Sequence, residues 1–484
     1  MKILGVNCLN HDAAITVIED REILFAAHSE RYSRKKNDKF LNDAIVNEAL
    51  SFGTPDKIVY YEKPYLKKSR QLVSGQWSSA FSSHSLPKPY LKKWFDDKVQ
   101  CIDHHLSHAA AGFLTSTYDE AVVVVIDGIG EWDVCTIWHG AAGRLKKIKS
   151  IKYPHSLGLF YSAMTKRIDL KPCEEEYILM GMSAWGTPKH RREMMSDLFD
   201  RSDVLKLKHN LHNGVGDYLE GAERFDIAAS TQAVTEDVLS SIFSLSKKLI
   251  PGVKNLVYMG GVALNCVANS NVAAEMFSNI WIMPSPGDSG SSLGCAAYVS
   301  NHKVNWRGPF LGTEIQGGYP VKPVLDAILE KKIAGVASGR AEFGPRALGN
   351  RSLLADPRGP DIKDRVNEIK RRQKFRPFAP AVLEEHAKDI FDMPRGSVPY
   401  MQFVAKCRRP DLYPAICHVD NTSRVQTVSE KDNPGFYRLI TEFYKKTGCP
   451  MLLNTSLNIK GQPIVNDESH AKEFEARYDV PVLS

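Results

Sequence analysis

Two histidines in the segment DHHLSH, residues 103–108, have the spacing of a metal-binding pair. His104 and His108 are four residues apart in a helix-prone stretch, so both imidazoles leave one face and can bind one ion. Asp127 ends an apolar strand-like run and Asp288 opens an expected helix, positions that converge at a sheet edge. Two imidazoles and two carboxylates suit Fe²⁺, Mn²⁺ or Zn²⁺. The alternative is that these histidines pack a helix and these aspartates serve turns; four such positions together favour the metal.

Glycine turns follow two of the expected strands. Gly260 and Gly261 lie between a strand and a helix, where backbone N–H groups can bind a phosphate, and the residues around Asp288 repeat this pattern. We assign Gly260, Gly261 and Asn265 to nucleotide binding. The evidence from the glycines alone is weak, because many α/β turns need glycine simply to pack.

The densest unusual segment spans residues 339–380 and interleaves arginine and lysine with glycine and proline. Guanidinium groups suit phosphates, and a merely solvated surface would not need so many turn residues, so we predict an anion site. Polar side chains at 418–428 and 453–465, Thr455 and Asn458 among them, suit a nucleotide pocket, although buried turns also use such residues. The nucleotide-binding residues predicted in this part are Arg340, Arg346, Arg351, Lys370, Arg376, Arg424, Asn454 and Ser456.

Strands and helices must position these side chains, and hydrophobic periodicity predicts an α/β chain. Three short strands are expected in the first 30 residues, and strand–turn–helix patterns recur around both glycine turns. Helices are further expected at 41–52, 104–116 and 227–250. Strands are expected at 56–61, 99–102 and 120–127. Residues 306–322 are rich in glycine and proline and are predicted to be a linker between domains at 1–305 and 323–484.

The composition indicates a globular protein of two or three domains. The chain has 484 residues, 43% of them hydrophobic and 25% charged. It has no apolar run of membrane-spanning length and no secretion signal, so we expect a cytoplasmic location and no membrane partner. Nine cysteines without a CxxC pair predict reduced thiols. The net charge of +7 permits an anionic partner without requiring one.

Taken together, these motifs resemble the O-carbamoyltransferase family of the nodulation-factor and cephamycin type over nearly the whole chain. The segments that carry the resemblance are NxxxHDAA (7–14), ERYSRKKND (30–38), DHHLSHAAAGF (103–113), VVIDGIGE (124–131), SLGLFYSA (156–163), MGGVALNC (259–266), GDSGSSLGCA (287–296), GRAEFGPRALGNRS (339–352), FRPFAP (375–380) and NTSLNIKGQPIV (454–465). The resemblance implies an actin- and hexokinase-like (ASKHA) N-terminal domain and a C-terminal α/β domain similar to the YrdC type.

The same resemblance implies a two-step reaction. The C-terminal domain would make carbamoyl-adenylate from carbamoyl phosphate and ATP, with Mg²⁺ as the expected companion of ATP. The N-terminal domain would transfer the carbamoyl group to an acceptor hydroxyl, with a divalent ion, usually iron, held by the two histidines and two aspartates. His11 and Lys36 match the family's polar residues beside the acceptor and the intermediate. We expect His11 to accept the hydroxyl proton and Arg346 to stabilise phosphate charge.

Two features concern the acceptor. The family usually has a lysine soon after a Glu-Tyr pair, whereas here Glu176-Tyr177 is followed by ILMG, so the acceptor of antibiotic-making relatives does not carry over. Residues 63–95, in contrast, contain seven Lys/Arg, no acid and six aromatics, a composition that suits nucleic acid or an ordinary surface loop.

The overlapping run YYEKPYLKKSRQLVSGQW, residues 60–77, also resembles bacteriophage-encoded members of the family, and some phage relatives modify hydroxymethylated pyrimidines in DNA. It therefore favours 5-hydroxymethylcytosine in DNA, or its nucleotide, as the acceptor, and the host cytoplasm as the location if the chain is phage-encoded. The alternatives are a sugar hydroxyl of a secondary metabolite and a non-catalytic nucleotide-binding scaffold. A homodimer is among the expected assemblies.

Overall fold

Two five-stranded sheets with the same connectivity frame the N-terminal part of the computed structural model, which describes residues 1–83, 86–95, 99–200, 202–373 and 375–484. The first sheet has the order β3-β2-β1-β4-β5 and the second β8-β7-β6-β9-β10. In each, the central strand pairs antiparallel with the next strand in sequence and parallel with the fourth. This repeated order is the expected actin- and hexokinase-like arrangement, so that prediction is confirmed.

The strands of these two sheets have three to nine residues, and all except β5, β8 and β10 are mostly buried. Their bounds are β1 (Lys2–Asn7), β2 (Ala14–Glu19), β3 (Glu22–His28), β4 (Lys57–Tyr60) and β5 (Val99–Cys101), then β6 (Glu120–Ile126), β7 (Asp133–Ala141), β8 (Arg144–Lys152), β9 (Asn255–Met259) and β10 (Asn279–Trp281). The three strands expected in the first 30 residues are therefore confirmed.

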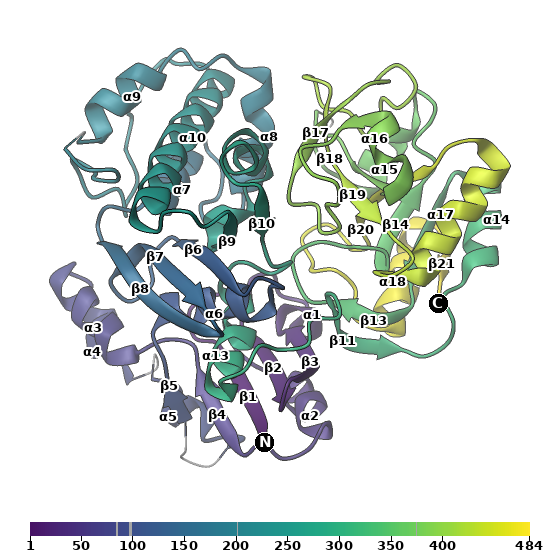
Figure 1. Ribbon diagram of the computed structural model, residues 1–484. Coiled ribbons are helices and arrows are strands. Elements are labelled where there is room, and N and C mark those ends of the chain that lie inside the picture. The colour runs from purple at the N-terminus through teal and green to yellow at the C-terminus, as the bar shows by residue number, and fades with distance from the viewer. Residues whose placement is uncertain (84–85, 96–98, 201, 374) are drawn as a thin grey trace. The chain divides into compact units, whose positions relative to one another are not determined.

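Two helices pack against each other between the sheets. Helix α13 (Ser291–Ser300) packs on β1, β2 and β4, and α6 (His104–Thr115) packs on β6 and β9 (Figure 1). Glycine makes their close approach possible, because a Cβ built on Gly294 of α13 would lie 1.8 Å from the carbonyl oxygen of Ser107 in α6. This contact brings the start of α6 near the start of α13, and both starts carry predicted metal ligands.

Further helices cover the second sheet and flank the first. The long helix α10 (Arg224–Leu249) packs with α7 (Leu157–Arg167), α8 (Glu176–Met182) and α9 (Arg191–Leu198), as the upper left of Figure 1 shows. The remaining elements of this part are α2 (Asp43–Ser51), α3 (Pro64–Val73), α4 (Trp77–Phe81), α5 (Pro87–Leu91), η2 (Ser183–Trp185), η3 (Gly261–Leu264), α11 (Cys266–Ala268), η4 (Asn269–Ala273), α12 (Ala274–Met276) and η5 (Asp288–Gly290).

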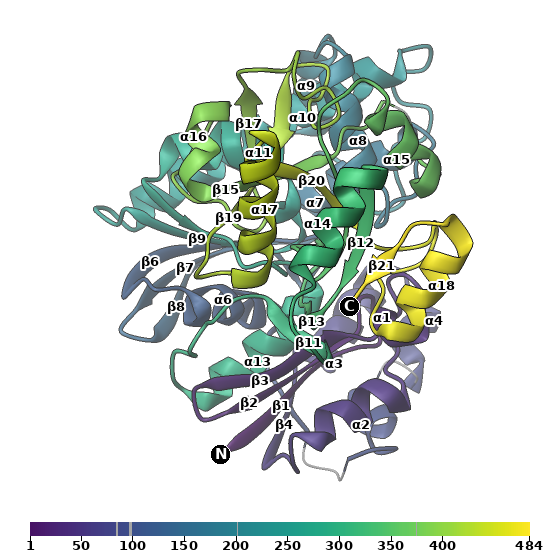
Figure 2. The same ribbon diagram turned by 90° about the vertical axis from the view of Figure 1, so that its right-hand side faces the viewer.

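The C-terminal part is built on a six-stranded mixed sheet of order β19-β15-β20-β14-β12-β21. Helices α14 (Val321–Lys331) and α17 (Pro434–Thr447) pack on each other and on this sheet (Figure 2). The strands are β11 (Phe310–Ile315), β12 (Ile333–Ala337), β13 (Gly339–Glu342), β14 (Arg351–Ala355), β15 (Ala379–Leu383), β16 (Phe391–Asp392), β17 (Val404–Cys407), β18 (Thr422–Arg424), β19 (Gln426–Val428), β20 (Met451–Ser456) and β21 (Val482–Leu483). The other helices are α15 (Ile362–Lys370), η6 (Glu384–His386), α16 (Ala387–Ile390) and α18 (Glu468–Tyr478).

The packing divides the chain into two units with an unexpected boundary. Unit 1 comprises Met1–Ala26 and Lys39–Trp306, and unit 2 comprises Ala27–Asp38 and Arg307–Ser484. Residues 27–38, with the short helix α1 (Glu30–Ser33), thus pack with the C-terminal part of the chain. Residues 306–322, expected to be a linker, contain β11, which pairs antiparallel with β13 of unit 2. Among the described residues no helix is long and apolar enough to cross a membrane.

Candidate metal centre and anion site

The four predicted metal ligands converge in unit 1. His104 and His108 from α6, Asp127 after β6 and Asp288 before α13 are all buried, with ligand atoms within 4.8 Å of one another. The two histidine Nε2 atoms lie 3.1 Å apart. Asp288 Oδ1 is 3.3 Å from both of them, and Asp127 Oδ2 is 3.4 Å from that of His104.

These separations fit one metal ion. Ligands about 2.1 Å from a common ion lie roughly 3.0 Å apart in an octahedron and roughly 3.4 Å apart in a tetrahedron. His108 Nδ1 lies 3.1 Å from the carbonyl oxygen of Pro286, which can only accept a hydrogen bond. We therefore assign the proton to Nδ1, which leaves a lone pair on His108 Nε2 for the ion.

The residues around the ligands orient them. Gly261 N–H donates to Asp127 Oδ1 at 3.0 Å, which leaves Oδ2 to face His104. Glu131 Oε1 accepts from the backbone N–H groups of Lys63 and His104, at 2.7 and 3.0 Å, and so fixes the start of α6. Glu131 was not among the predicted residues, although it lies only four residues after Asp127. Burial is the main cause that raises the pKa of Glu131 to about 7.

The ligand charges are strongly coupled. Burial of His104 lowers its pKa. The negative charge of Asp288 outweighs this effect and raises the pKa of His104 well above its ordinary value. Burial raises the pKa of Asp288, but His104 and His11 outweigh it and hold that pKa well below the usual range. These shifts favour a proton on His104 over one on Asp288, and a metal cation would replace that proton.

His11 lies between this cluster and solvent. Its Nε2 is 3.4 Å from Asp288 Oδ2, its Nδ1 is 3.1 Å from Asp12 Oδ2, and 47% of its side chain is exposed. Burial lowers the pKa of His11, but Asp288 and Asp12 outweigh it and raise the pKa to about 10. A cation bound by Asp288 would oppose this rise. Among the predicted catalytic residues, His11 is the one in unit 1 beside the metal ligands.

The glycine turn predicted to bind a phosphate serves the metal cluster instead. Gly260 N–H donates to the same Pro286 oxygen that faces His108, and Gly261 N–H is taken by Asp127. Gly260 has φ 93°, and a Cβ there would lie 2.1 Å from the carbonyl oxygen of Ile126. Asn265 exchanges hydrogen bonds with Gln232 and caps α11 through Ala268 N. These contacts engage the polar groups of the three residues, and their nucleotide-binding role stays a prediction.

Two of the arginines predicted to bind an anion hold the backbone of unit 2. Arg351 has an exposed fraction of 0%, and its guanidinium donates to five carbonyl oxygens, those of Asn466, Ser338, Asn350, Thr313 and Gly339. Arg340 donates to the carbonyl oxygens of Leu311 and Gly312 in β11. Donors used in this way do not reach a phosphate, so the predicted role of Arg351 is corrected to a structural one and that of Arg340 is weakened.

Another set of cations does gather, around Lys370. The Nζ of this buried lysine donates to the carbonyl oxygens of Ser456 and Asn458 and to the side-chain oxygen of Asn458. Burial lowers its pKa well below the ordinary value, and the nearby charges of Arg372, Lys36 and Arg376 add to that. Its hydrogen-bond acceptors are neutral, so an incoming anion would meet a concentration of positive charge. Lys36 belongs to this group because residues 27–38 pack in unit 2.

The other predicted residues of unit 2 lie on neighbouring elements. Asn454 in β20 is buried and donates to the carbonyl oxygen of Ala347 and to Gln426 Oε1. Arg424 on β18 and Arg346 in the loop after β13 are partly buried. The structure thus brings Lys36, Lys370, Arg376 and Ser456 together and leaves Arg346 and Arg424 as expectations.

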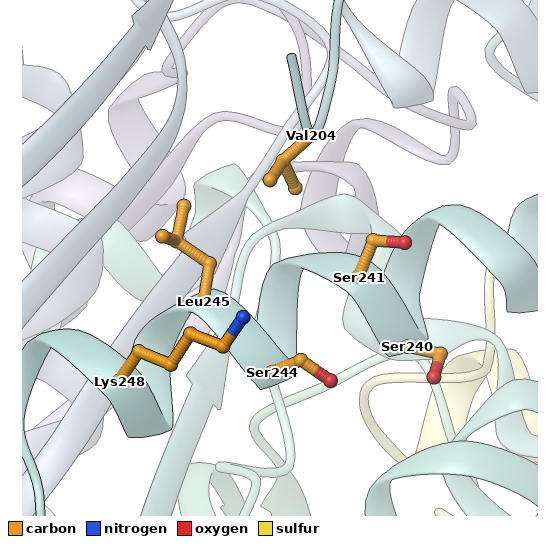
Figure 3. Close-up of a pocket in the computed structure, with 6 residues that line it drawn as sticks. All are labelled: Val204, Ser240, Ser241, Ser244, Leu245 and Lys248. Atoms are coloured by element: carbon orange, nitrogen blue, oxygen red, sulfur yellow. The ribbon is translucent and has the colours of Figure 1, made fainter. Parts of the chain in front are cut away.

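A surface hollow of ≈ 300 Å³ lies elsewhere, along α10. Figure 3 shows that Val204 and the helix face of α10 line it. Its six lining residues are Val204, Ser240, Ser241, Ser244, Leu245 and Lys248. None of them is a predicted ligand or catalytic group, so the hollow adds nothing to the chemistry of the site.

The basic and aromatic stretch 63–95 is only partly available to a partner, and its residues 84 and 85 lie outside the described part. Five of its seven cations contact neighbouring groups of the protein, namely Lys63, Lys67, Lys68, Arg70 and Lys93. Phe95 is buried, and Tyr90 and Trp94 hydrogen-bond to Leu41 and Asp43. The exposed aromatic rings are Tyr65, Trp77 and Phe81, with exposed fractions of 76%, 61% and 76%.

Family models match nearly the whole chain. The model described as carbamoyltransferase N-terminus matches residues 2–73 and 59–297, and the one described as carbamoyltransferase C-terminus matches 325–484. Nodulation protein NolNO of Sinorhizobium fredii is 31% identical, over 96% of this chain and 76% of its own length. Nodulation protein NolO of Bradyrhizobium diazoefficiens is 34% identical, over 76% of this chain and 75% of its own length.

Two further similarities were found, one to a protein sequence and one to a solved structure. An uncharacterized protein of Synechocystis is 34% identical, over 96% of this chain and 92% of its own length. Component A of the (R)-2-hydroxyglutaryl-CoA dehydratase of Acidaminococcus fermentans matches with a TM-score of 0.36 and 16% identity, over 62% of this chain and 97% of that one, which carries no functional argument. On the family models and these sequence relatives, the chain belongs to the carbamoyltransferase family.

Proposed function

We propose that this carbamoyltransferase is an ATP-dependent O-carbamoyltransferase that works in two steps. Unit 2 makes carbamoyl-adenylate from carbamoyl phosphate, ATP and water, with release of phosphate and pyrophosphate, and unit 1 transfers the carbamoyl group to an acceptor hydroxyl. The observation that carries the proposal is the buried set of two histidines and two aspartates with His11 at its solvent side. A purely structural cluster would not need an ionisable, half-exposed side chain in contact with it.

The proposed metal site consists of His104, His108, Asp127 and Asp288. Two imidazoles and two carboxylates suit Fe²⁺, which we favour, or Mn²⁺ or Zn²⁺. A divalent ion held there supplies Lewis acidity toward a carbonyl or phosphate oxygen. The charges fit such an ion, because two aspartates and two neutral imidazoles balance a dication.

His11 is the proposed general base of the transfer step. Its imidazole accepts the proton of the attacking hydroxyl, the hydroxyl oxygen bonds to the carbamoyl carbon, and AMP leaves with the bonding electron pair. The contact of His11 Nδ1 with Asp12 holds the ring, and Nε2 faces the cluster. The exposure of the ring gives an acceptor access to it.

The proposed adenylate-forming site lies around Lys370 in unit 2. Lys36, Arg372 and Arg376 supply positive charge for the phosphates of ATP, and Ser456 and Asn458 position the Lys370 amine beside them. Arg346 stabilises charge that develops on the transferred phosphate. Mg²⁺ accompanies the ATP.

The proposed acceptor is 5-hydroxymethylcytosine in DNA, or its nucleotide. The exposed rings Tyr65, Trp77 and Phe81 support it, because aromatic rings stack on bases without regard to sequence. The local ion pairs of Lys63, Lys67 and Lys93 reduce the charge available to a phosphate backbone. The alternative acceptor, a sugar hydroxyl of a secondary metabolite, is therefore tested in the same assay as the DNA.

One assay separates these possibilities. The protein is incubated with Fe²⁺, ATP and carbamoyl phosphate, first alone and then with 5-hydroxymethylcytosine DNA, its nucleotide or sugar acceptors. Mass spectrometry detects the gain of one carbamoyl group. We expect carbamoyl-adenylate without any acceptor and a carbamoylated base in the DNA arm; carbamoylation of sugars alone would overturn the DNA proposal, and the absence of adenylate would overturn the two-step scheme.

The role of His11 is tested with His11→Asn in the same assay. Loss of the base should slow transfer by about 10²- to 10⁴-fold and leave adenylate formation at the wild-type rate. Transfer at an unchanged rate would reduce His11 to a binding residue.

A further inference from the structure

A buried carboxylate lies on the far side of one metal ligand. Glu62 follows β4 and is 2% exposed. Its Oε2 faces His104 Nδ1 at 3.8 Å, and its Oε1 accepts a hydrogen bond from Lys67 Nζ at 2.8 Å. Lys67 belongs to the first turns of α3, so this ion pair joins the surface helix to the proposed metal site.

Two of the other three ligands have a hydrogen-bonded outer contact: His108 Nδ1 with the Pro286 oxygen, and Asp127 Oδ1 with Gly261 N–H. Asp288 Oδ2 makes no hydrogen bond but faces His11 Nε2 at 3.4 Å. His104 Nδ1 is likewise buried and makes no hydrogen bond at the present separation. An ion on Nε2 would place the ring proton on Nδ1, where it requires an acceptor.

We propose that Glu62 is a positioning residue of the metal site, which accepts the Nδ1 proton of His104 so that Nε2 faces the ion. The inference rests on the proposed metal-dependent function. The distance of 3.8 Å between Glu62 Oε2 and His104 Nδ1 is longer than a hydrogen bond. A small movement of the ring or the carboxylate would bring the two atoms within hydrogen-bonding distance. Carboxylate, imidazole and metal in this order fix both the tautomer and the orientation of the ligand.

Lys67 completes the arrangement through charge. The two aspartates balance a divalent ion, so the buried Glu62 would add one uncompensated negative charge. Lys67 supplies the matching positive charge at 2.8 Å, and its side chain is itself largely buried. The pair therefore allows a carboxylate behind His104 without a net charge in the interior.

The test measures binding of Co²⁺ alone to the full-length protein, by competition with a chelator and by the visible spectrum of the bound ion. Glu62→Gln should weaken the affinity about 10- to 100-fold and alter the spectrum, as expected for loss of an outer contact to a ligand. Glu62→Asp keeps the charge beside Lys67 but shortens the reach to His104, so it should weaken Co²⁺ binding while the apoprotein keeps its stability.

The matched control is Glu120→Gln. Glu120 faces His139 Nε2 at 2.7 Å on the second sheet, and neither residue belongs to the cluster, so the affinity should stay within about twofold of wild type. Wild-type affinity and spectrum in both Glu62 variants would overturn the inference, as would a change in stability alone. If Glu62→Gln does not fold, Glu62→Asp decides.

The outcome also separates this inference from the function on which it rests. If the wild-type protein binds no Co²⁺, or if His104→Ala binds it as well as wild type does, the proposed metal site itself fails. If His104→Ala loses Co²⁺ while both Glu62 variants retain it, only the role of Glu62 fails.

Discussion

A single methyl group at Gly294 should disrupt the metal cluster, because this glycine sets the spacing of α6 and α13. A Cβ there would lie 1.8 Å from the carbonyl oxygen of Ser107 and 2.8 Å from Ala111 N, whereas real Cβ contacts essentially never fall below 3.0 Å. In Gly294→Ala the helices must therefore separate by about 1.2 Å, the difference between these values. Metal sites tolerate ligand displacements of roughly 0.2 Å.

The displaced carbonyl belongs to the residue next to His108, and Asp288 comes just before α13. We therefore expect Gly294→Ala to lose divalent-ion binding and about 1–3 kcal/mol of unfolding free energy through overpacking. Ion affinity is measured by chelator competition, and stability by urea denaturation of the apoprotein.

Gly181→Ala in α8 is the matched control, since nothing lies within 4 Å of its added Cβ. It should keep ion affinity and gain about 0.5–1 kcal/mol, because alanine is the better helix former. The reasoning is refuted if Gly294→Ala binds the ion as tightly as Gly181→Ala does with undiminished stability.

Two further predictions concern unit 2. Arg351→Ala strips five carbonyl oxygens of their donor and should lower the free energy of unfolding by at least about 3 kcal/mol in urea denaturation; a loss below about 1 kcal/mol would contradict the structural role. Lys370 has a lowered pKa in the folded chain. Between that pKa and the ordinary lysine value of 10.5, the unfolded chain binds a proton that the folded chain does not, so the free energy of unfolding should rise with pH. Compared with wild type, Lys370→Met should flatten that rise in denaturation curves between neutral pH and pH 10, and equal slopes would show that Lys370 keeps its proton.

The grouping of the four proposed ligands could be predicted from the sequence because most of their positions follow from local spacing. His104 and His108 are one helical turn apart, and Asp127 ends a strand whose apolar run is unmistakable. Glu62 was missed because its proposed role depends on the end of β4 lying near the start of α6, and nothing in the surrounding basic stretch indicates that proximity. Hydrophobic periodicity predicts single helices and strands, but it does not predict long-range contacts of this kind between them.

The arginines of unit 2 show a second limit. An arginine among glycines and prolines suits a phosphate and a ring of backbone carbonyls equally well, since both offer oxygen acceptors to a guanidinium. Only the fold distinguished Arg351, which holds carbonyls, from the cations around Lys370. Strand β11 was missed for a related reason: its partner β13 lies beyond a helix and a strand, and their register is interrupted.

The placement of residues 27–38 in unit 2 has a consequence for synthesis on the ribosome. Arg31 donates to the carbonyl oxygen of Gly344, 313 residues later, and Arg34 to that of Ile464, 430 residues later. At about 5–20 residues per second, the nascent α1 waits about 20–90 seconds for the last of these partners. During that interval unit 1, to which residues 27–38 do not belong, can fold. Unit 2 can therefore complete its folding only after both the N-terminal segment 27–38 and the C-terminal part of the chain have been synthesised.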